Sequence, residues 1–370
     1  MKGMGFEMDN GKITSFQVSL LMYSVILATG FITIPAISAH YAMNDFWLAP
    51  VLAILAGGSV LAISIKLHQL YPNKNLIQYS ERIIGKVPGK ILGIIYFQFF
   101  VFTCGIVSRE YAEFVTGNFL FKTPMFCLVI LMVLLAAFAV RGGVELIVRS
   151  TLLLTPLFIL PLFFLLLLLP DFKVSNILPF MSHGFIPVIK GSLAPVSWYS
   201  EFLIIAYFLP SVIDQNKTVK YSFLSLLAVS ASLTYVCLVA LFVLGPDTAN
   251  KVYPVLTAFR YISRADFFEN LEALLLAMWV VGNFIKIAAV YYAAVLSFTS
   301  CFNLKDYKPY VFPIGILIVI HCFWDIPSFF KMAGFLATVG SFHLSTFMLV
   351  VPFLLFIIAL CRKQWSKLVS

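Results

Sequence analysis

The sequence predicts an all-α polytopic membrane protein, and three observations support this fold class. Hydrophobic residues make up 61% and charged residues 11% of the 370-residue chain, whereas soluble domains contain roughly 45–50% apolar and roughly 25% charged residues. Long apolar stretches alternate with short charged loops. A β-barrel would instead show short segments of alternating polarity, but residues 152–169 form one apolar run with prolines as its only helix-breaking residues.

About ten stretches are long enough to cross a membrane, since a spanning helix needs about 20 apolar residues. The predicted spans are residues 14–38, 46–68, 89–119, 123–140, 145–169, 188–211, 218–245, 268–300, 309–325 and 333–360. The first span begins after Thr14, is longer than a signal-peptide core and lacks a small-residue cleavage pattern. We therefore expect it to stay in the mature protein.

The formal charge of +9 reflects how basic residues are distributed between the two sides of the membrane. Sixteen of the 25 Lys and Arg residues fall in loops on the side of the N-terminus, and seven fall on the other side. Because cytoplasmic loops are enriched in Lys and Arg, both termini are predicted to be cytoplasmic. The basic charge then indicates contact with anionic membrane lipid, and no nucleic-acid partner is expected.

The loops between spans are too short to form soluble domains, so residues 1–370 are predicted to form a single transmembrane domain. Residues 71–88 contain apolar side chains among charges, a pattern that fits either a short amphipathic interfacial helix or an ordinary loop. The six cysteines form no C-x-x-C pair, and we interpret them as small hydrophobic residues.

Helix-breaking residues occur at matching places in the first and sixth spans. The first span contains Thr29-Gly30 and Pro35, and the sixth contains Gly191 and Pro195. If residues 14–169 and 188–360 are inverted repeats, interrupted helices at these positions indicate a transporter-type binding site, because freed backbone groups need a partner other than lipid. The alternative is that Gly and Pro are simply commoner in membrane helices.

Two charged residues lie near the middle of predicted spans. Glu201 is near the middle of the sixth span, where an ionisable group costs about 2.5–3.5 kcal/mol. It is either a ligand or proton site or half of an internal ion pair. Lys286 lies in the eighth span with Asn283 three residues before it. Its ammonium either occupies the place of a bound cation beside the first helix or pairs with Glu201 or a carbonyl.

Other polar residues in the spans have structural interpretations. Arg109 and Glu113 are spaced i, i+4 in the third span and are expected to pair. His321 and His343 have no second His or carboxylate at metal-binding spacing, so we interpret them as satisfied polar residues and expect no metal site. The chain lacks H-E-x-x-H, Walker, G-x-G-x-x-G and G-x-S-x-G motifs, which excludes the common enzyme classes that use them. No catalytic residues or cofactors are predicted.

A series of short motifs resembles one known family along most of the chain. The motifs are Lys12-Ile13-Thr14-x-x-Gln17 with Gly30 and Pro35, Asp45-Phe46-Trp47, Asn75-Leu76 with Gly85-Lys86, Ile177-Leu178-Pro179 with Gly184 and Pro187, Glu201 with Pro210, Tyr253-Pro254, and Phe268-Glu269-Asn270-Leu271-Glu272 leading to Trp279. Together they resemble the B subunits of bacterial spore germinant receptors, a branch of the amino acid/polyamine/organocation transporter superfamily.

The resemblance implies a LeuT-like fold of two inverted five-helix repeats with broken helices 1 and 6. It also implies detection of amino-acid germinants in the inner membrane of the spore, in a complex with an A-type membrane subunit and a C-type lipoprotein subunit. Two positions depart from the family pattern. Tyr199 stands where permeases often have a small residue, and Asn270 stands where a basic residue is expected.

The predicted function is a nutrient germinant receptor subunit that binds a small amino acid at the membrane midplane and triggers germination with its partners. Helix ends at the two breaks would attract the carboxylate and ammonium groups of the ligand, and apolar surroundings favour an alanine- or valine-like side chain. The predicted ligand-binding residues are Thr29, Gly30, Phe31, Trp198, Tyr199, Glu201, Asn283 and Lys286. A proton-coupled amino-acid permease and a structural subunit with a vestigial pocket are the alternatives.

Overall fold

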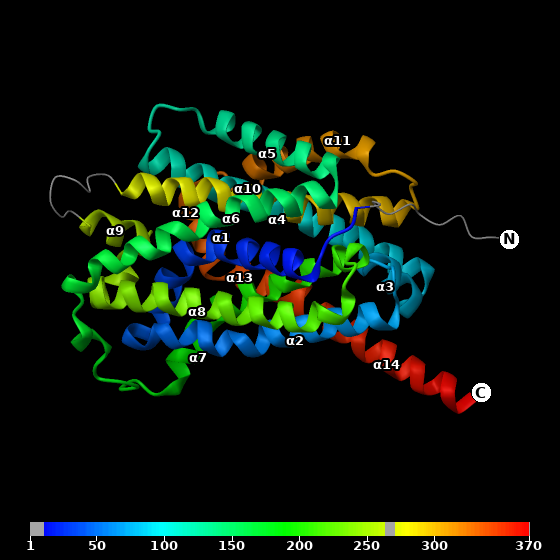
Figure 1. Cartoon of the computed structure of the whole chain (residues 1–370), viewed down its shortest axis with the longest axis horizontal. Helices are drawn as coiled ribbons and strands as arrows, with labels where there is room; N and C mark the ends of the chain where they lie inside the picture. The colour runs from blue at the N-terminus through cyan, green and yellow to red at the C-terminus, as the bar shows by residue number, and fades with distance from the viewer. Residues whose placement is uncertain (1–10, 263–270, 370) are drawn as a thin grey trace.

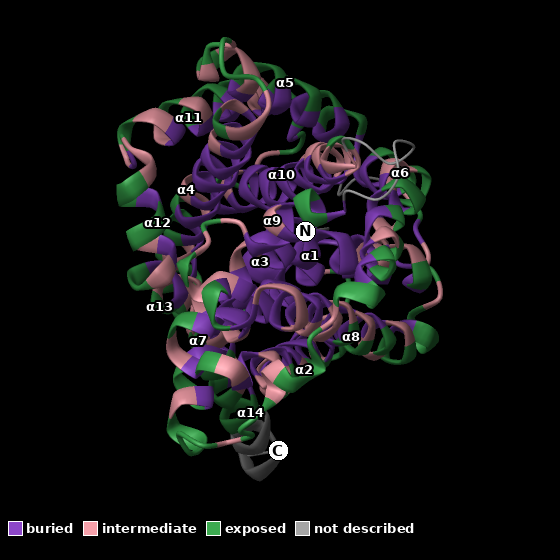
Figure 2. Ribbon diagram, turned by 90° about the vertical axis from the view of Figure 1, so that its left-hand side faces the viewer, coloured by how far each residue is buried: buried purple, intermediate pink, exposed green. Residues whose placement is uncertain are grey.

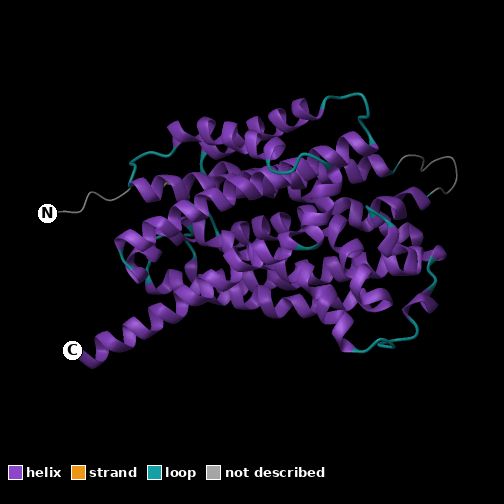
Figure 3. Cartoon of the chain, turned by 180° about the vertical axis from the view of Figure 1, so that it is seen from behind, coloured by secondary structure: helices purple, strands orange, loops and turns teal. Residues whose placement is uncertain are grey.

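The computed structural model describes residues 11–262 and 271–369, with side chains up to residue 362. Figures 1 and 3 show helices joined by loops. The α-helices are α1 Ser15–Ala42, α2 Ala49–Leu70, α3 Leu76–Ile84, α4 Lys86–Asn118, α5 Met125–Gly142, α6 Val144–Phe164, α7 Phe185–Ser200, α8 Thr218–Leu244, α9 Pro254–Tyr261, α10 Glu272–Phe302, α11 Val311–Trp324, α12 Phe329–Ala337, α13 Val339–Ser345 and α14 Val351–Val369. Of the motif residues, Phe268, Glu269 and Asn270 lie outside the described part of the chain.

Each of the ten predicted spans overlaps a helical segment. Seven segments of the described residues are long and apolar enough to cross a membrane, or eight if the bent pair α11 and α12 counts as one span. One of the seven is the 56-residue run Ser15–Leu70, which holds both α1 and α2 with the 3-10 helix η1 (Met43–Leu48) between them. The protein is therefore an integral membrane protein, and the count of ten crossings stays a prediction.

The sixth span combines two kinds of helix. α7 has 16 residues and is about 24 Å long, which is shorter than the roughly 30 Å hydrocarbon core. The 3-10 helix η4 (Glu201–Tyr207) follows without a gap and adds about 14 Å at its larger rise per residue. Together they can cross the bilayer, and the change of helix type begins at Glu201.

The centre of the bundle is formed by α1, α4 and α10, which each carry more buried residues than any other helix and are largely purple in Figure 2. α1 is apolar around its whole circumference, which is typical of a helix that is surrounded by protein or lipid, and its residues 21–32 are all buried. It packs against α6, α7, α8 and α10. The first and sixth spans thus lie side by side in the core.

The start of α1 is fixed to the segment between the sixth and seventh spans. Ile13 donates to the Ser211 carbonyl at 3.0 Å, and Ile213 donates back to the Ile13 carbonyl at 3.0 Å. The Ser15 N–H then donates to Asp214 Oδ1 at 2.6 Å. Figure 3 shows that the start of α1 and the end of α14 lie at the same end of the bundle.

Residues 71–88 contain a helix, which decides between the two interpretations of this segment. Asn75 caps α3 by accepting hydrogen bonds from the N–H groups of Ile77 and Gln78, a strong start signal. The apolar face of α3 is buried, and Leu76, Ile77 and Tyr79 are all inaccessible to solvent. α3 packs against α4, α10 and α14, so protein rather than lipid covers this face.

The predicted interruption at Thr29-Gly30 is wrong, because α1 is a continuous α-helix from Ser15 to Ala42. The predicted interruption near Gly191 and Pro195 is also misplaced, since α7 runs through both residues to Ser200. Gly191 serves close packing instead: a Cβ there would lie 2.8 Å from Ala42 Cβ. Proline removes the helical partner of the carbonyl four residues earlier, and Ser38 Oγ donates to that Gly191 carbonyl at 2.9 Å.

A sharp bend separates α11 from α12. The two helices meet at 96°, and Pro327 lies between them. Proline cannot continue a helix and disfavours helical conformation in the residue before it. Ser328 then starts α12 by accepting the N–H of Lys331 through its side chain. The bend turns α12 across the side of the bundle, where it covers the candidate site.

Candidate functional site

A buried ion pair joins the sixth and eighth spans. Lys286 Nζ on α10 lies 2.8 Å from both carboxylate oxygens of Glu201, the first residue of η4. The two side chains are only 1% and 2% exposed. The sequence left open whether Glu201 and Lys286 pair with each other, and the structure shows that they do. Removing one partner from such a pair is strongly destabilising, because the remaining charge stays buried without compensation.

Thr29 of α1 completes this network. Its Oγ1 accepts a hydrogen bond from Lys286 Nζ at 2.9 Å and one from Trp198 Nε1 at 2.8 Å. Side chains from α1, α7, η4 and α10 thus meet at one point in the core. The prediction placed Lys286 beside a break in the first helix, and in the structure its ammonium contacts that helix through the Thr29 hydroxyl.

Thr29, Trp198, Glu201 and Lys286 line a central cavity, and the other predicted ligand-binding residues do not. Phe31 packs edge-on against Phe158 and Trp279. Gly30, Tyr199 and Asn283 are also buried outside this lining. Asn283 donates to the Trp279 carbonyl at 2.9 Å within α10. These four residues are buried on the same helices as the residues that line the cavity, but they do not line it themselves.

Residues of α4, α12 and α13 form the rest of the central cavity, including Glu110, Leu336 and His343. The cavity volume is about 30 Å³, which is room for about two water molecules. An amino acid needs more space. Binding at this place therefore requires movement of the cavity wall, and the bent α12 segment is the part of the wall that crosses the bundle.

Glu110 is a site residue that the sequence interpretation missed. It is 3% exposed, and its Oε1 accepts a hydrogen bond from Thr33 Oγ1 of α1 at 2.7 Å. The sequence interpretation passed over it in favour of the Arg109–Glu113 pair. Residues at i and i+4 share a helix face while neighbours do not, so the pairing of Arg109 with Glu113 already implied that Glu110 points elsewhere.

Arg109 and Glu113 form the expected ion pair on α4, with Arg109 Nη2 2.6 Å from Glu113 Oε1. His321 is hydrogen-bonded, as expected of a satisfied polar residue, through a carboxylate that the sequence interpretation overlooked. Its Nδ1 lies 2.5 Å from Asp325 Oδ2, four residues later. This pair lies at the start of the bend after α11. Among the residues that the structure describes, no three His, Cys, Asp or Glu side chains gather at metal-binding distance.

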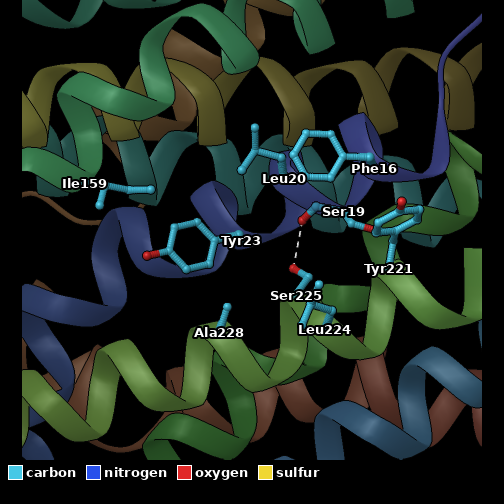
Figure 4. A pocket seen from close by; sticks show the side chains of 9 residues that line it. All are labelled: Phe16, Ser19, Leu20, Tyr23, Ile159, Tyr221, Leu224, Ser225 and Ala228. Atoms are coloured by element: carbon cyan, nitrogen blue, oxygen red, sulfur yellow. Dashed lines mark hydrogen bonds between the residues drawn. The ribbon is translucent and has the colours of Figure 1, made fainter.

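Two larger cavities lie away from the ion pair, along the surface where α1, α6 and α8 meet. Their volumes are about 260 Å³ and 420 Å³, and Tyr23 and Ile159 line both. Figure 4 shows the first, with Phe16 and Leu224 at its edge. These two side chains are about half exposed. The lining is almost entirely apolar, so these cavities suit lipid chains better than a zwitterion.

The sequence matches one family model, described as spore germination protein, over residues 12–330. Spore germination protein KB of Bacillus subtilis (strain 168) is 21% identical over 364 residues, covering 96% of this chain and 97% of that protein. Spore germination protein YndE of the same organism is 25% identical over 375 residues, covering 96% and 98%.

Solved transporter structures share the fold at low sequence identity. A Na⁺-coupled sialic acid symporter in a substrate-bound outward-open state gives a TM-score of 0.68 at 13% identity, covering 91% of this chain and 78% of that one. MhsT in complex with L-phenylalanine gives 0.65 at 12% identity, covering 95% and 98%. These likenesses confirm the LeuT-like helical fold that the resemblance implied.

Proposed function

The chain belongs to the family of spore germination proteins, and from this premise we propose that it is a nutrient germinant receptor subunit that binds a small amino acid near the membrane midplane. The family consists of permease-like membrane proteins, not enzymes. The proposal uses the eight residues predicted from the sequence, of which Thr29, Trp198, Glu201 and Lys286 form the cavity wall and the others support it.

The observation that carries the proposal is the Glu201–Lys286–Thr29 network beside the central cavity. Ionisable groups in a membrane interior are costly and normally face a cavity or a partner, and here they do both. The network ties α1 to η4 and α10. A ligand that exchanges contacts with it would therefore change how these spans are held together, which is the response that a receptor needs.

The charges at the site favour a ligand with a neutral side chain. Glu201 and Lys286 are already paired with each other, so neither is available as the counter-ion of a charged side chain. Alanine- or valine-like amino acids fit this chemistry. MhsT, whose fold is shared, was solved in complex with L-phenylalanine, which supports an amino acid as the ligand class.

The proposed setting is the inner membrane of a spore, with both termini on the cytoplasmic side. We propose that the partners are an A-type membrane subunit and a C-type lipoprotein subunit, because a sensor with such short loops needs another protein to transmit its signal. A proton-coupled amino-acid permease, in which Glu201 or Lys286 changes protonation, is the second candidate, and the transporter fold of the structural relatives favours it.

The test is a screen of the common amino acids for thermal stabilisation of the purified full-length protein in lipid nanodiscs. A ligand that binds only the folded state raises the unfolding temperature. Trp198→Ala removes one wall of the cavity and should abolish the shift, whereas Arg149→Ala, at an exposed position, should not. No shift with any amino acid would contradict the proposal. Uptake of the radiolabelled ligand into proteoliposomes would favour the permease.

A further inference from the structure

A second cavity, which we call the peripheral cavity, adjoins the site. Its volume is about 160 Å³, several times that of the central cavity. Side chains of α1, α4, α12 and the segment before α9 line it. Glu110 and Leu336 line both cavities, so they form the partition between them. In the predicted orientation, the peripheral cavity lies toward the outside of the membrane.

The charges around these cavities leave Glu110 without a basic partner. Lys286 is paired with Glu201, Arg109 with Glu113, and Lys251, which lines the peripheral cavity, with Asp247 at 2.6 Å. Within residues 11–262 and the side chains of 271–362, Glu110 has no lysine or arginine at ion-pair distance.

An unpaired carboxylate is expensive in a low-dielectric interior, and a cation that enters the peripheral cavity can offset that cost. The oxygen atoms of Glu110 and Thr33 meet at this point. A Ca²⁺ ion needs six to eight oxygen ligands, which this pair does not supply. A primary ammonium has only three N–H donors to satisfy, and it forms short, strong hydrogen bonds with a carboxylate.

We infer that Glu110 binds the ammonium group of an α-amino acid that enters through the peripheral cavity, with Leu336 of α12 as the movable partition. This inference rests on the proposed function and adds the position and chemistry of the ammonium site. The ligand carboxylate then points toward the Glu201–Lys286–Thr29 network beside the central cavity and exchanges contacts with it. Ile37, Phe329 and Met332 line the peripheral cavity and suit an aliphatic side chain.

Three probes test the inference on the full-length protein in nanodiscs: L-valine, isobutylammonium, which lacks the carboxylate, and 2-hydroxyisovalerate, which lacks the ammonium. Glu110→Gln keeps the shape of the side chain and removes its charge. Hydrogen bonds to charged groups are the stronger kind, so we expect this variant to bind L-valine and isobutylammonium about ten- to a hundredfold more weakly. The hydroxy acid should bind the wild type no better than it binds Glu110→Gln.

Glu145→Gln is the matched control, because it changes a carboxylate that is paired with Arg149 and lies outside the lining of both cavities. It should keep the wild-type affinity. Thr33→Val is a second variant at the site and should weaken L-valine binding without removing a charge.

If Glu110→Gln and the wild type bind L-valine equally, the inference fails while the proposed function stands. If no amino acid binds the wild type, the proposed function fails, and isobutylammonium then tests Glu110 alone. Loss of its binding in Glu110→Gln supports the cation site, and absence of binding to the wild type overturns it.

Discussion

Arg109 and Glu110 are adjacent on α4, but one side chain contacts the bend before α12 and the other lines the cavities that α12 covers. Glu110 faces the cavities that α12 covers. Arg109 holds the bend from which α12 starts: its guanidinium lies 5.7 Å from the Phe323 ring centroid, and Nη2 is 3.5 Å from the Pro327 carbonyl oxygen. One turn of α4 therefore carries both a site residue and a contact that positions the wall of the site.

Arg109→Lys should loosen α12. Lysine keeps the charge but loses the planar guanidinium that stacks on Phe323 and reaches both Glu113 and the bend. We expect hydrogen exchange of the backbone amides in residues 329–337 to become about tenfold faster, which corresponds to about 1.4 kcal/mol of local stability. Exchange in α10 should not change. Equal exchange of α12 in both proteins would show that Arg109 does not hold the bend.

Lys286→Met should destabilise the protein strongly. The substitution leaves Glu201 buried without its partner, and breaking a buried pair in this way costs about 3–5 kcal/mol. Thermal unfolding of the purified protein measures the change. The double variant Lys286→Met/Glu201→Gln should recover most of the loss, since it removes both charges. Arg149→Met breaks an exposed pair and should have little effect. If the double variant is as unstable as the single one, the charge pairing is not the cause.

Thr29→Val should weaken the connection between α1 and the ion pair. Valine has nearly the shape of threonine, but it cannot accept the hydrogen bonds from Lys286 and Trp198. Leaving buried donors unsatisfied costs about 1–3 kcal/mol, which thermal unfolding will detect. Thr29→Ser keeps the hydroxyl and should lie between the wild type and valine. A fully stable Thr29→Val would mean that water or another group replaces the hydroxyl.

The sequence predicted the fold well because membrane helices depend on local composition. A long apolar run identifies a membrane span without any knowledge of tertiary contacts. The runs that became α1 and α10 are examples. The charge pair was also within reach, since an ionisable residue in an apolar span needs a partner. Glu201 and Lys286 lie near the middle of predicted helices 6 and 8, and their pairing was one of the alternatives that the sequence left open.

The continuity of α1 and α7 and the role of Glu110 could not be predicted in the same way. Gly191 is explained by its 2.8 Å approach to Ala42, a contact between residues far apart in the sequence. A glycine required for packing and a glycine required for a helix break look the same in one sequence. Glu110 gains its role from Thr33 on α1 and from the cavities beside α12, and these relationships exist only in three dimensions.

The orientation can be tested with single cysteines at positions 74 and 173. Lys74 precedes α3, which lies near the end of α14 (Figure 1). The Lys173 N–H donates to the Phe242 carbonyl near the end of α8, at the other end of the bundle. With cytoplasmic termini, a membrane-impermeant thiol reagent added outside should label Lys173→Cys but not Lys74→Cys. The wild-type cysteines are replaced beforehand. The reverse pattern would overturn the orientation and the outward direction of the peripheral cavity.

Gly30→Leu should abolish the response to the cognate amino acid while the protein still accumulates in the membrane. A Cβ at Gly30 would lie 3.2 Å from Ile34 Cδ1 and 3.5 Å from Trp198 Cδ1. Alanine therefore fits with a small shift of a flexible side-chain end, and Gly30→Ala should respond nearly as the wild type does. The longer leucine must displace Trp198, whose indole is held by Thr29 and lines the central cavity.

Trp198→Ala removes the same wall directly and should also raise the amino-acid concentration needed for a half-maximal response. The measurement is that concentration, compared at equal protein levels in the membrane. If both Gly30→Leu and Trp198→Ala leave it unchanged, Trp198 does not border the ligand, and the binding site lies elsewhere in the protein.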